Sequence, residues 1–321
     1  MSRYLITGIA GFIGSTLAHT LVEQGHDVRG IDNLSTGSLD NLADIRDQID
    51  FHQVDLQDVA GMRSACEGVE YVLHHAAIAS VPRSVKDPLT SHESNINGTL
   101  NLLLAARDAK VRRIVYAASS SAYGDQPTQP KQEDMPPLPL SPYAVQKLAC
   151  EYYIQSFYRS YGLEGICLRY FNIFGPRQAA DSPYSGVIAK FTTMMMTGET
   201  PTIFGDGLTS RDFNYVDNAV SANLLACTAP SSVATGRVFN IGTGRSHTLN
   251  EVYAAIASQL GFTAKPIYGR TREGDIKHSL ADISRASKEL GYQPKAHFHD
   301  GLQKTVAWYL AGKEKKAAAT L

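Results

Sequence analysis

Short apolar runs alternate with longer amphipathic segments through the first half of the chain, and this alternation predicts the fold. Runs typical of β-strands occupy residues 4–7, 27–31, 51–54, 69–74, 112–118 and 165–170. Helical patterns stand between them, most clearly at residues 15–24 and 90–110, where apolar residues recur every three or four positions. Strands that alternate with helices predict a doubly wound parallel α/β sheet, which binds its ligand at the carboxyl ends of its strands.

The pattern becomes less regular after residue 172, where loops alternate with short elements. A helix is expected through Ile188, Phe191 and the methionine run that begins at Met194, and residues 238–241 are expected to return to the main sheet. We therefore expect a first domain of residues 1–172 with about 212–240, and a smaller, discontinuous α/β lobe of residues 173–211 and about 241–312. Residues 313–321, charged and then alanine-rich, are expected to be a flexible tail.

The composition narrows the classes of partner. The 321 residues are 43% hydrophobic and 19% charged, and the formal net charge is −1. This near-zero charge offers no broad attraction to nucleic acid or to an anionic membrane. The four cysteines are far apart in the sequence, so neither a disulfide framework nor a metal site is expected, and a reducing cytoplasm fits them. The glycine-interrupted N-terminus predicts neither a signal peptide nor a membrane span.

Three glycines follow the first apolar run and open the first helix. Gly8 permits a tight turn, Gly11 lets a diphosphate approach the backbone, and Gly14 permits close packing of helix and strand. The first N–H groups of the helix, at Phe12 and Ile13, then point toward the phosphates. A glycine pattern between a strand and a helix is the arrangement required of a dinucleotide site.

An acidic residue stands where such a site needs one. Asp32 ends the second predicted strand, 18 residues after Gly14. Its carboxylate can accept hydrogen bonds from ribose hydroxyls and would repel a 2′-phosphate, which favours NAD over NADP. The alternative is that Asp32 and Asn33 merely form a turn. Further cofactor contacts are expected from the loop after this strand and from the ends of the next two strands: Asn33, Ser35, Thr36, Gly37, Asp55, Leu56, Ala76 and Ala77.

A second candidate site lies where a helix begins after a proline-rich loop. Ser141 is a natural N-cap and Pro142 suits the first turn, so Tyr143 and Lys147 lie one turn apart on the same helix face. A phenol has a pKa of about 10, and a neighbouring ammonium favours the phenolate. The pair is therefore a candidate proton acceptor. An amphipathic surface helix, with a lysine that extends past an aromatic ring, is the alternative.

These motifs occur together in a fixed order. The glycine turn is followed by Ser119-Ser120-Ser121 with Tyr123-Gly124, and then by Tyr143-x-x-x-Lys147. This set resembles the extended short-chain dehydrogenase/reductase family, specifically its NAD-dependent UDP-hexose 4-epimerases, and most of all the bacterial UDP-N-acetylglucosamine 4-epimerases. The resemblance covers nearly the whole chain, including residues 80–84, 168–172, 210–213 and 272–275.

The resemblance implies a role for each matching residue. Tyr143 is the base, Lys147 holds the nicotinamide ribose, and Ser119 hydrogen-bonds the reacting hydroxyl, with Ser120 and Ser121 able to assist. NAD remains tightly bound and is regenerated each turnover; it also lies near Asn95, Tyr170 and Phe171. The UDP-sugar is bound by Ser80, Ser119, Ser120, Tyr143, Asn172, Gly186, Val187, Lys190, Arg211, Arg272, Asp275 and Ser279. Cations in that set suit a diphosphate, although each alone is equally consistent with a surface charge.

The implied reaction is C4 epimerisation through a transient 4-keto sugar. Related 4,6-dehydratases and decarboxylases carry a carboxylic acid in the segment occupied here by three serines, so both are disfavoured. Ser279 matches a position where a small residue leaves room for a 2-acetamido group, which favours UDP-GlcNAc and UDP-GalNAc, with UDP-Glc and UDP-Gal as possible weaker substrates. A serine packed under a loop is the alternative role for this position.

The sequence is also compatible with two other functions. A UDP-glucuronate 4-epimerase would need a cation for the C6 carboxylate, and Lys190, Arg177 or Lys277 could supply it. A catalytically silent NAD-binding regulator could use the same fold. The family also implies a homodimer through the helices near residues 90–110 and 142–161.

Overall fold

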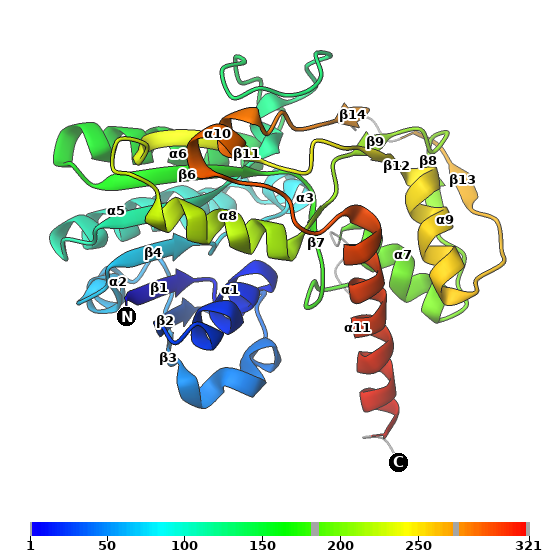
Figure 1. Ribbon diagram of the computed structural model, residues 1–321, viewed down its shortest axis with the longest axis horizontal. Coiled ribbons are helices and arrows are strands. Elements are labelled where there is room, and N and C mark those ends of the chain that lie inside the picture. Colours follow the sequence, from blue (N-terminus) through cyan, green and yellow to red (C-terminus); the bar gives the residue numbers. More distant parts are fainter. Residues whose placement is uncertain (1, 181–185, 272–275, 319–321) are drawn as a thin grey trace.

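A parallel sheet of seven strands organises the larger part of the molecule (Figure 1). The structure is a computed structural model that describes residues 2–180, 186–271 and 276–318. The strand order is β11-β6-β5-β4-β1-β2-β3, with bounds β1 Arg3–Thr7, β2 Asp27–Asp32, β3 Asp50–Gln53, β4 Tyr71–His74, β5 Arg113–Ser119, β6 Glu164–Tyr170 and β11 Thr235–Ile241. The predicted doubly wound sheet is confirmed, and residues 238–241 do return to it, next to β6.

Helices cover both faces of this sheet because its strands bury side chains on both sides. Ile6 belongs to the core on one face and its neighbour Leu5 to the core on the other, as alternation along a strand requires. The first face is covered by α1 Phe12–Glu23, η1 Leu39–Gln48, α8 Val216–Thr228 and α10 Ser284–Leu290. The second is covered by α2 Val59–Cys66, α5 Gly98–Asp108 and α6 Pro142–Tyr161.

The long helix expected at residues 90–110 is interrupted. It consists of α4 Pro88–His92, the π-helical turn η2 Glu93–Asn97 and α5, and it follows the short helix α3 Val81–Lys86. The widened turn contains buried Asn95, whose Oδ1 accepts from the Ile78 N–H at 2.8 Å and whose Nδ2 donates to Gln146 Oε1 at 2.8 Å. Periodicity alone does not reveal a π turn, because it adds a single residue to the repeat.

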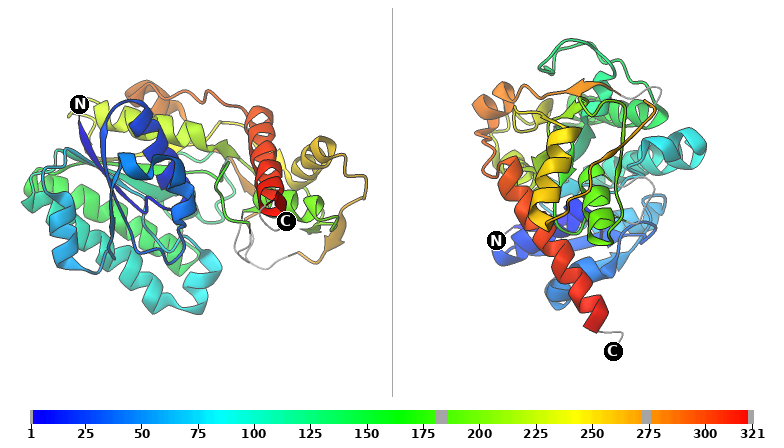
Figure 2. Two further views of the ribbon diagram at one scale, coloured as in Figure 1. Left: turned by 90° about the horizontal axis from the view of Figure 1, so that it is seen from below. Right: turned by 90° about the vertical axis from the view of Figure 1, so that its right-hand side faces the viewer.

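A smaller group of elements packs beside the sheet around its own core (Figures 1 and 2). Its helices are α7 Val187–Met196, α9 Leu249–Leu260 and α11 Phe298–Ala318. Phe191 and Met195 of α7 are buried there, so the predicted helix is confirmed, and of the methionine run Met195 belongs to this core while Met194 lines a cavity. The short strands are β7 Ile173–Phe174, β8 Thr202–Phe204, β9 Ser210–Arg211, β10 Asn214–Tyr215, β12 His247–Thr248, β13 Ile267–Gly269 and β14 His278–Ser279.

The last helix, α11, extends into the segment that was expected to be a flexible tail. A flexible tail was expected from residue 313, but α11 continues as a helix to Ala318. Lysine, glutamate and alanine are strong helix formers, so a helix already established by packing at Phe298 and Leu302 can extend through them.

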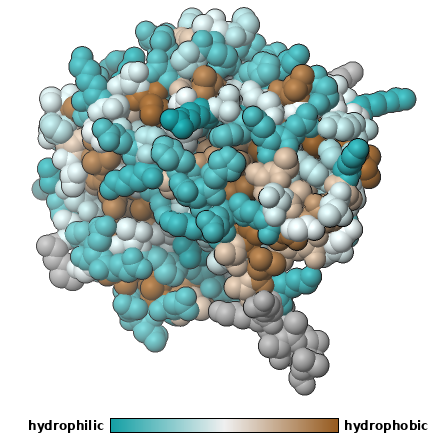
Figure 3. Space-filling model, turned by 45° about the vertical axis from the view of Figure 1, so that its right-hand side comes forward, coloured by the Kyte–Doolittle hydropathy of each residue, from teal (hydrophilic) through white to brown (hydrophobic). Residues whose placement is uncertain are grey.

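The surface is of mixed character. Hydrophobic residues are interspersed with hydrophilic ones on the face shown in Figure 3. Within the part of the chain that the structure describes, no helix combines the length and the apolar character needed to span a bilayer.

Candidate active site

The glycine turn has the shape that a dinucleotide diphosphate requires. Gly8 adopts a φ of 70°, and a Cβ on Gly14 would lie 2.1 Å from the Gly8 carbonyl oxygen. Helix α1 starts after Gly11 and has no side-chain cap. The first N–H groups of α1, at Phe12 and Ile13, are therefore not engaged by a capping side chain, and they fit a diphosphate.

The carboxylate of Asp32 lies beside this turn and has unused hydrogen-bond acceptor sites. Its Oδ2 accepts from the Ala10 N–H at 3.0 Å and its Oδ1 from the Leu34 N–H at 2.8 Å. A carboxylate has about four lone-pair sites, so these two bonds leave room for a ribose diol. A Cβ on Gly37 would lie 3.0 Å from Oδ2, which shows how closely the following loop approaches. The turn and the carboxylate together fit the adenosine half of NAD.

The other residues predicted around the cofactor fall into two groups. Some lie at the surface or at strand ends on the carboxyl edge of the sheet: Asn33, Ser35, Thr36, Asp55, Ala76 and Ala77. The Nδ2 of Asn33 donates to Asp55 Oδ2 at 2.6 Å. The others have side chains engaged inside the protein. Leu56 packs against helix α5, Asn95 bonds Ile78 and Gln146, Tyr170 bonds His75 and Asn223, and Phe171 packs against Tyr123 and Ala281.

His74 has a structural role in the core of the larger domain. It is buried between Thr7 and Thr99, with Nδ1 2.7 Å from one hydroxyl and Nε2 2.9 Å from the other. Burial holds the pKa of this imidazole well below its usual value. A neutral ring with both nitrogens engaged links β1, β4 and α5 beneath the carboxyl edge of the sheet.

The structure brings Ser119 and Tyr143 together. Ser119 ends β5, and Tyr143 lies in the first turn of α6, after Ser141, whose Oγ accepts from the Ala144 N–H at 3.2 Å. The Ser119 oxygen accepts from both the N–H and the hydroxyl of Ser121, at 3.2 and 2.8 Å. The Ser119 side chain also lies close enough to the Tyr143 phenol to lower the pKa of that phenol. A hydroxyl and a phenol thus converge at the carboxyl edge of the sheet.

The prediction that Lys147 lowers the pKa of Tyr143 is wrong in this structure. Burial raises the pKa of Tyr143 to about 12, and the neighbouring Ser119 side chain acts in the opposite direction. Lys147 is 4% exposed, its Nζ donates to the Ala117 carbonyl at 2.8 Å, and it lies 4.8 Å from the centre of the Tyr116 ring. Burial lowers the pKa of Lys147 to about 8. Desolvation therefore outweighs the attraction expected from the i, i+4 spacing.

A buried ion pair supports the same helix one turn further on. The guanidinium of Arg169 donates to both carboxylate oxygens of Glu151, at 2.9 and 2.8 Å, and both residues are almost fully buried. Glu151 follows Lys147 by one turn, and its charge raises the pKa of that lysine, against the effect of burial. This face of α6, which also carries Tyr143 and Lys147, is thus joined to β6.

A cavity of about 590 Å³ lies in the smaller lobe, within the usual range for small-molecule sites. Five residues predicted to contact substrate line it: Asn172, Gly186, Val187, Lys190 and Arg211. Sequence reasoning missed its remaining walls, which include Phe174, Phe204, Thr209, Phe213 and Leu249. The signal available for Phe204 was its place at the end of a short apolar run before Gly205; Phe174, Phe213 and Leu249 look like ordinary core residues, and Thr209 like an ordinary loop residue.

The remaining predicted substrate residues lie elsewhere. Ser279 in β14 is the register partner of Arg211 in β9. Ser80 caps α3 by accepting from the Arg83 N–H at 3.2 Å, and Ser120 begins the turn η3 Ser120–Tyr123. Arg272 and Asp275 fall outside the described residues.

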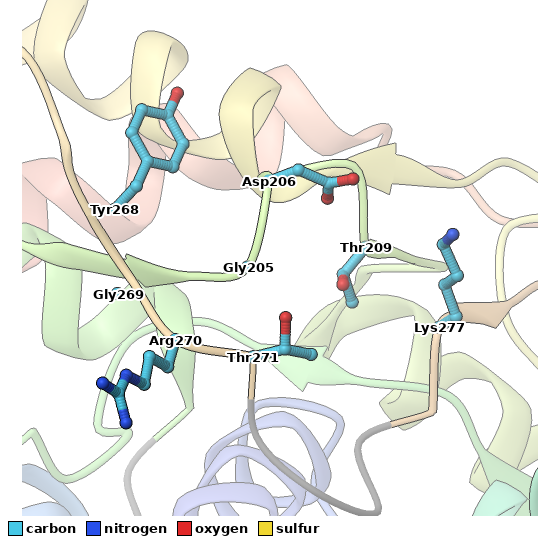
Figure 4. Close-up of a pocket in the computed structure, with 8 residues that line it drawn as sticks. All are labelled: Gly205, Asp206, Thr209, Tyr268, Gly269, Arg270, Thr271 and Lys277. Carbon is cyan, nitrogen blue, oxygen red and sulfur yellow. The ribbon is translucent and has the colours of Figure 1, made fainter.

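A second cavity, of about 750 Å³, adjoins the first at Thr209 (Figure 4). Its lining includes Thr209 and Thr271, which lie next to each other in this view, and Asp206 and Lys277, while Arg270 points away from the others. This opening lies between the turn that follows β8 and the segment that follows β13. Of its lining, only Lys277 had been considered from the sequence.

Comparisons with known proteins agree with this geometry. The model of the NAD dependent epimerase/dehydratase family matches residues 4–242. The chain belongs to this family. The resemblance inferred from the sequence is therefore confirmed, as is the NAD dependence that the glycine turn and Asp32 indicate.

Three relatives show the range of sugars within the family. A UDP-glucose 4-epimerase of Mycolicibacterium smegmatis is 39% identical over 96% of this chain and 98% of its own. The solved structure of a UDP-N-acetylglucosamine 4-epimerase from Methanobrevibacter ruminantium, in complex with UDP-N-acetylmuramic acid, has a TM-score of 0.92 at 39% identity and covers 97% and 99% of the two chains. A UDP-glucuronate 4-epimerase of Thermodesulfobacterium geofontis is 33% identical over 96% of each chain.

Proposed function

We propose that this family member inverts C4 of a UDP-hexose and that its preferred pair is UDP-GlcNAc and UDP-GalNAc, with weaker activity on UDP-Glc and UDP-Gal. The observation that carries the proposal is the placement of Ser119, at the end of β5, and of Tyr143, in the first turn of α6, at the carboxyl edge of the sheet. This edge also holds the glycine turn of the NAD site, and doubly wound sheets bind their ligands there.

The chain's own residues supply acid–base chemistry and positioning. Tyr143 takes the proton of the sugar 4-hydroxyl and later returns it, while Ser119 orients that hydroxyl. Bound NAD⁺ supplies a hydride acceptor and a positive charge, and such a charge favours the phenolate that burial alone disfavours. The 4-keto sugar exposes its opposite face before the carbonyl is reduced again. Lys190 and Arg211, which line the cavity, suit the two phosphates.

Ser279 supports the choice of acetylated sugars because it is small. We expect Ser279→Tyr to lower kcat/KM for UDP-GlcNAc by more than about 100-fold, since a bulky ring would occupy the space of the acetamido group. Activity on UDP-glucose should remain. Steady-state kinetics on both sugars would measure the effect. Unchanged turnover of UDP-GlcNAc by the variant would refute the assignment of Ser279.

The function is tested most directly with a panel of UDP-sugars incubated without added NAD. We expect C4 inversion of UDP-GlcNAc under these conditions, because the cofactor is regenerated in each turnover. NMR of the nucleotide sugars would detect the product. A dehydrated 4-keto-6-deoxy product would indicate a dehydratase. A protein that binds NAD but converts no UDP-hexose would instead be a silent regulator, and the proposal would fail.

UDP-glucuronate is the second candidate substrate. Lys190 lines the cavity and could meet a C6 carboxylate, and one relative carries this activity in its name. Arg177 is less suitable than the sequence suggested, because its Nη2 donates to Thr16 Oγ1 at 3.1 Å beneath helix α1. The same panel separates the two candidates.

A homodimer is part of the proposal. Exposed apolar side chains gather on α3, α4 and α6, helices that pack against one another; they include Val85 at 63%, Leu89 at 68% and Tyr152 at 54% exposure. A second copy of the chain would cover them. Sedimentation should give twice the mass of one chain, and a single-chain mass at micromolar concentration would exclude the dimer. The four cysteines are free and buried, which supports a reducing, cytoplasmic setting.

A further inference from the structure

The loop between the two candidate catalytic residues also reaches the strand that carries Ser279. Residues 124–140 follow η3, which begins after Ser119, and lead to the N-cap of the helix that carries Tyr143. The middle of this loop crosses to the segment around Ala281, with which Lys131 forms a parallel bridge. Figure 1 shows the loop, in teal, at the same end of the molecule as β14. Both ends of the loop are therefore tied to the catalytic residues, and its middle is tied to β14.

Gln129 holds the backbone on both sides of Ser279. Its Nε2 donates to the His278 carbonyl at 2.8 Å, and its Oε1 accepts from the Leu280 N–H at 3.1 Å. The Lys131 N–H then donates to the Leu280 carbonyl at 2.8 Å. One side-chain amide thus supplies the pair of bonds that a neighbouring strand would supply at this position.

The other edge of β14 is paired with β9, which lines the substrate cavity. The Asp212 N–H donates to the Ser279 carbonyl at 2.8 Å, and the Ser210 N–H donates to the Lys277 carbonyl at 3.0 Å. Arg211, the register partner of Ser279, is one of the cavity residues. The backbone at Ser279 is therefore held from two sides, by β9 and by the loop.

The loop itself is fixed to the main sheet. Asn240 of β11 donates from Nδ2 to the Lys131 carbonyl at 2.8 Å, and its N–H donates to Glu133 Oε1 at 2.8 Å. The side chain of Lys131 is buried, and its Nζ donates to the Gln126 and Thr128 carbonyls. These internal hydrogen bonds and the bonds to β11 hold the loop in one position. The loop can therefore hold β14, the strand that it contacts, in one position as well.

We propose that Gln129 is a positioning residue for substrate selection: it holds β14 at Ser279 and so sets the space next to the sugar C2 substituent. This inference rests on the proposed function, because it takes Ser279 as the residue that faces the acetamido group. Ser279 can select substrates by size only if the backbone of β14 keeps a fixed position beside the sugar. The two hydrogen bonds of Gln129 fix one edge of this strand.

The first test replaces Gln129 by a residue of similar length that can make neither bond. Gln129→Met should raise KM for UDP-GlcNAc about tenfold relative to KM for UDP-glucose, with smaller changes in kcat, because only the acetamido group contacts this wall. Gln132→Met is the matched control: it lies on the same loop and loses only the bond from Nε2 to Asp282 Oδ2 at 3.0 Å. The control should leave the KM ratio unchanged. An equal loss on both sugars in Gln129→Met would show a merely structural role and overturn the proposal.

The second test uses the bulky variant at Ser279. In Gln129→Met/Ser279→Tyr the ring is no longer held in place, so activity on UDP-GlcNAc should recover at least about tenfold over Ser279→Tyr alone. Gln132→Met/Ser279→Tyr should show no recovery. No recovery in the first double variant, or no effect of Ser279→Tyr itself, would overturn the inference. Failure of the unsubstituted protein to convert any UDP-hexose would instead defeat the proposed function, so the two failures are distinguishable.

Discussion

Tyr143→Phe is expected to lower kcat for C4 epimerisation by roughly 10²–10⁴-fold, the usual contribution of a positioned acid–base group. The substitution removes one oxygen, the atom that would exchange the proton of the sugar 4-hydroxyl and whose pKa the neighbouring Ser119 lowers. Initial rates at saturating UDP-GlcNAc would measure the effect. The KM should change little, because the phenyl ring keeps its place in the first turn of α6.

The same helix offers a matched control. Tyr158 lies four turns along α6 and is also partly buried, and Tyr158→Phe should retain nearly all of the activity. The NAD content and the melting temperature of both variants should match those of the unsubstituted protein. More than a tenth of the original activity in Tyr143→Phe would show that another group moves the proton.

Arg113→Met is expected to lower the free energy of unfolding by about 3–5 kcal/mol, the typical cost of removing one member of a buried ion pair. Arg113 is fully buried on β5. Its Nη1 donates to the carbonyls of Ala226, Cys227 and Ala229 at 2.7–2.9 Å, and its Nη2 donates to Glu164 at 2.6 Å. The carbonyls belong to the C-terminal end of α8, where a positive charge is favourable.

Chemical denaturation followed by circular dichroism would measure this loss. The neighbouring Arg112 is the control, because it is exposed and pairs with Glu70 at 3.1 Å on the surface. Arg112→Met should cost no more than about 1 kcal/mol. A similar small cost for Arg113→Met would mean that water or neighbouring groups satisfy the carbonyls of α8 once the guanidinium is gone.

The parts of the site that local sequence encodes could be predicted. The glycine turn depends on residues within one strand–turn–helix unit, and the shared face of Tyr143 and Lys147 depends only on helical periodicity. The identity of each residue then suggested its chemistry. The same local rules predicted the parallel sheet, because strands that alternate with helices can pair in few other ways.

The pKa of Tyr143 could not be predicted from the local sequence. The spacing of Tyr143 and Lys147 suggested a lowered phenol pKa, but that outcome depends on how deeply both groups are buried and on what else they bond. The carbonyl of Ala117 and the ring of Tyr116, which engage Lys147, come from β5, some 30 residues earlier in the chain. The hydrogen bond of Arg177 was inaccessible for a similar reason, since its partner Thr16 is 161 residues away.

By itself, the sequence determined the class of fold, the dinucleotide turn and the residues proposed to carry the chemistry, because each depends on the spacing of residues within a short segment of chain. Only the tertiary structure decided which apolar residues line the substrate cavity and that Gln129 holds the strand of Ser279 from 150 residues away. Contacts between distant segments depend on the packing of the whole chain, and no local pattern of hydrophobic and polar residues specifies them.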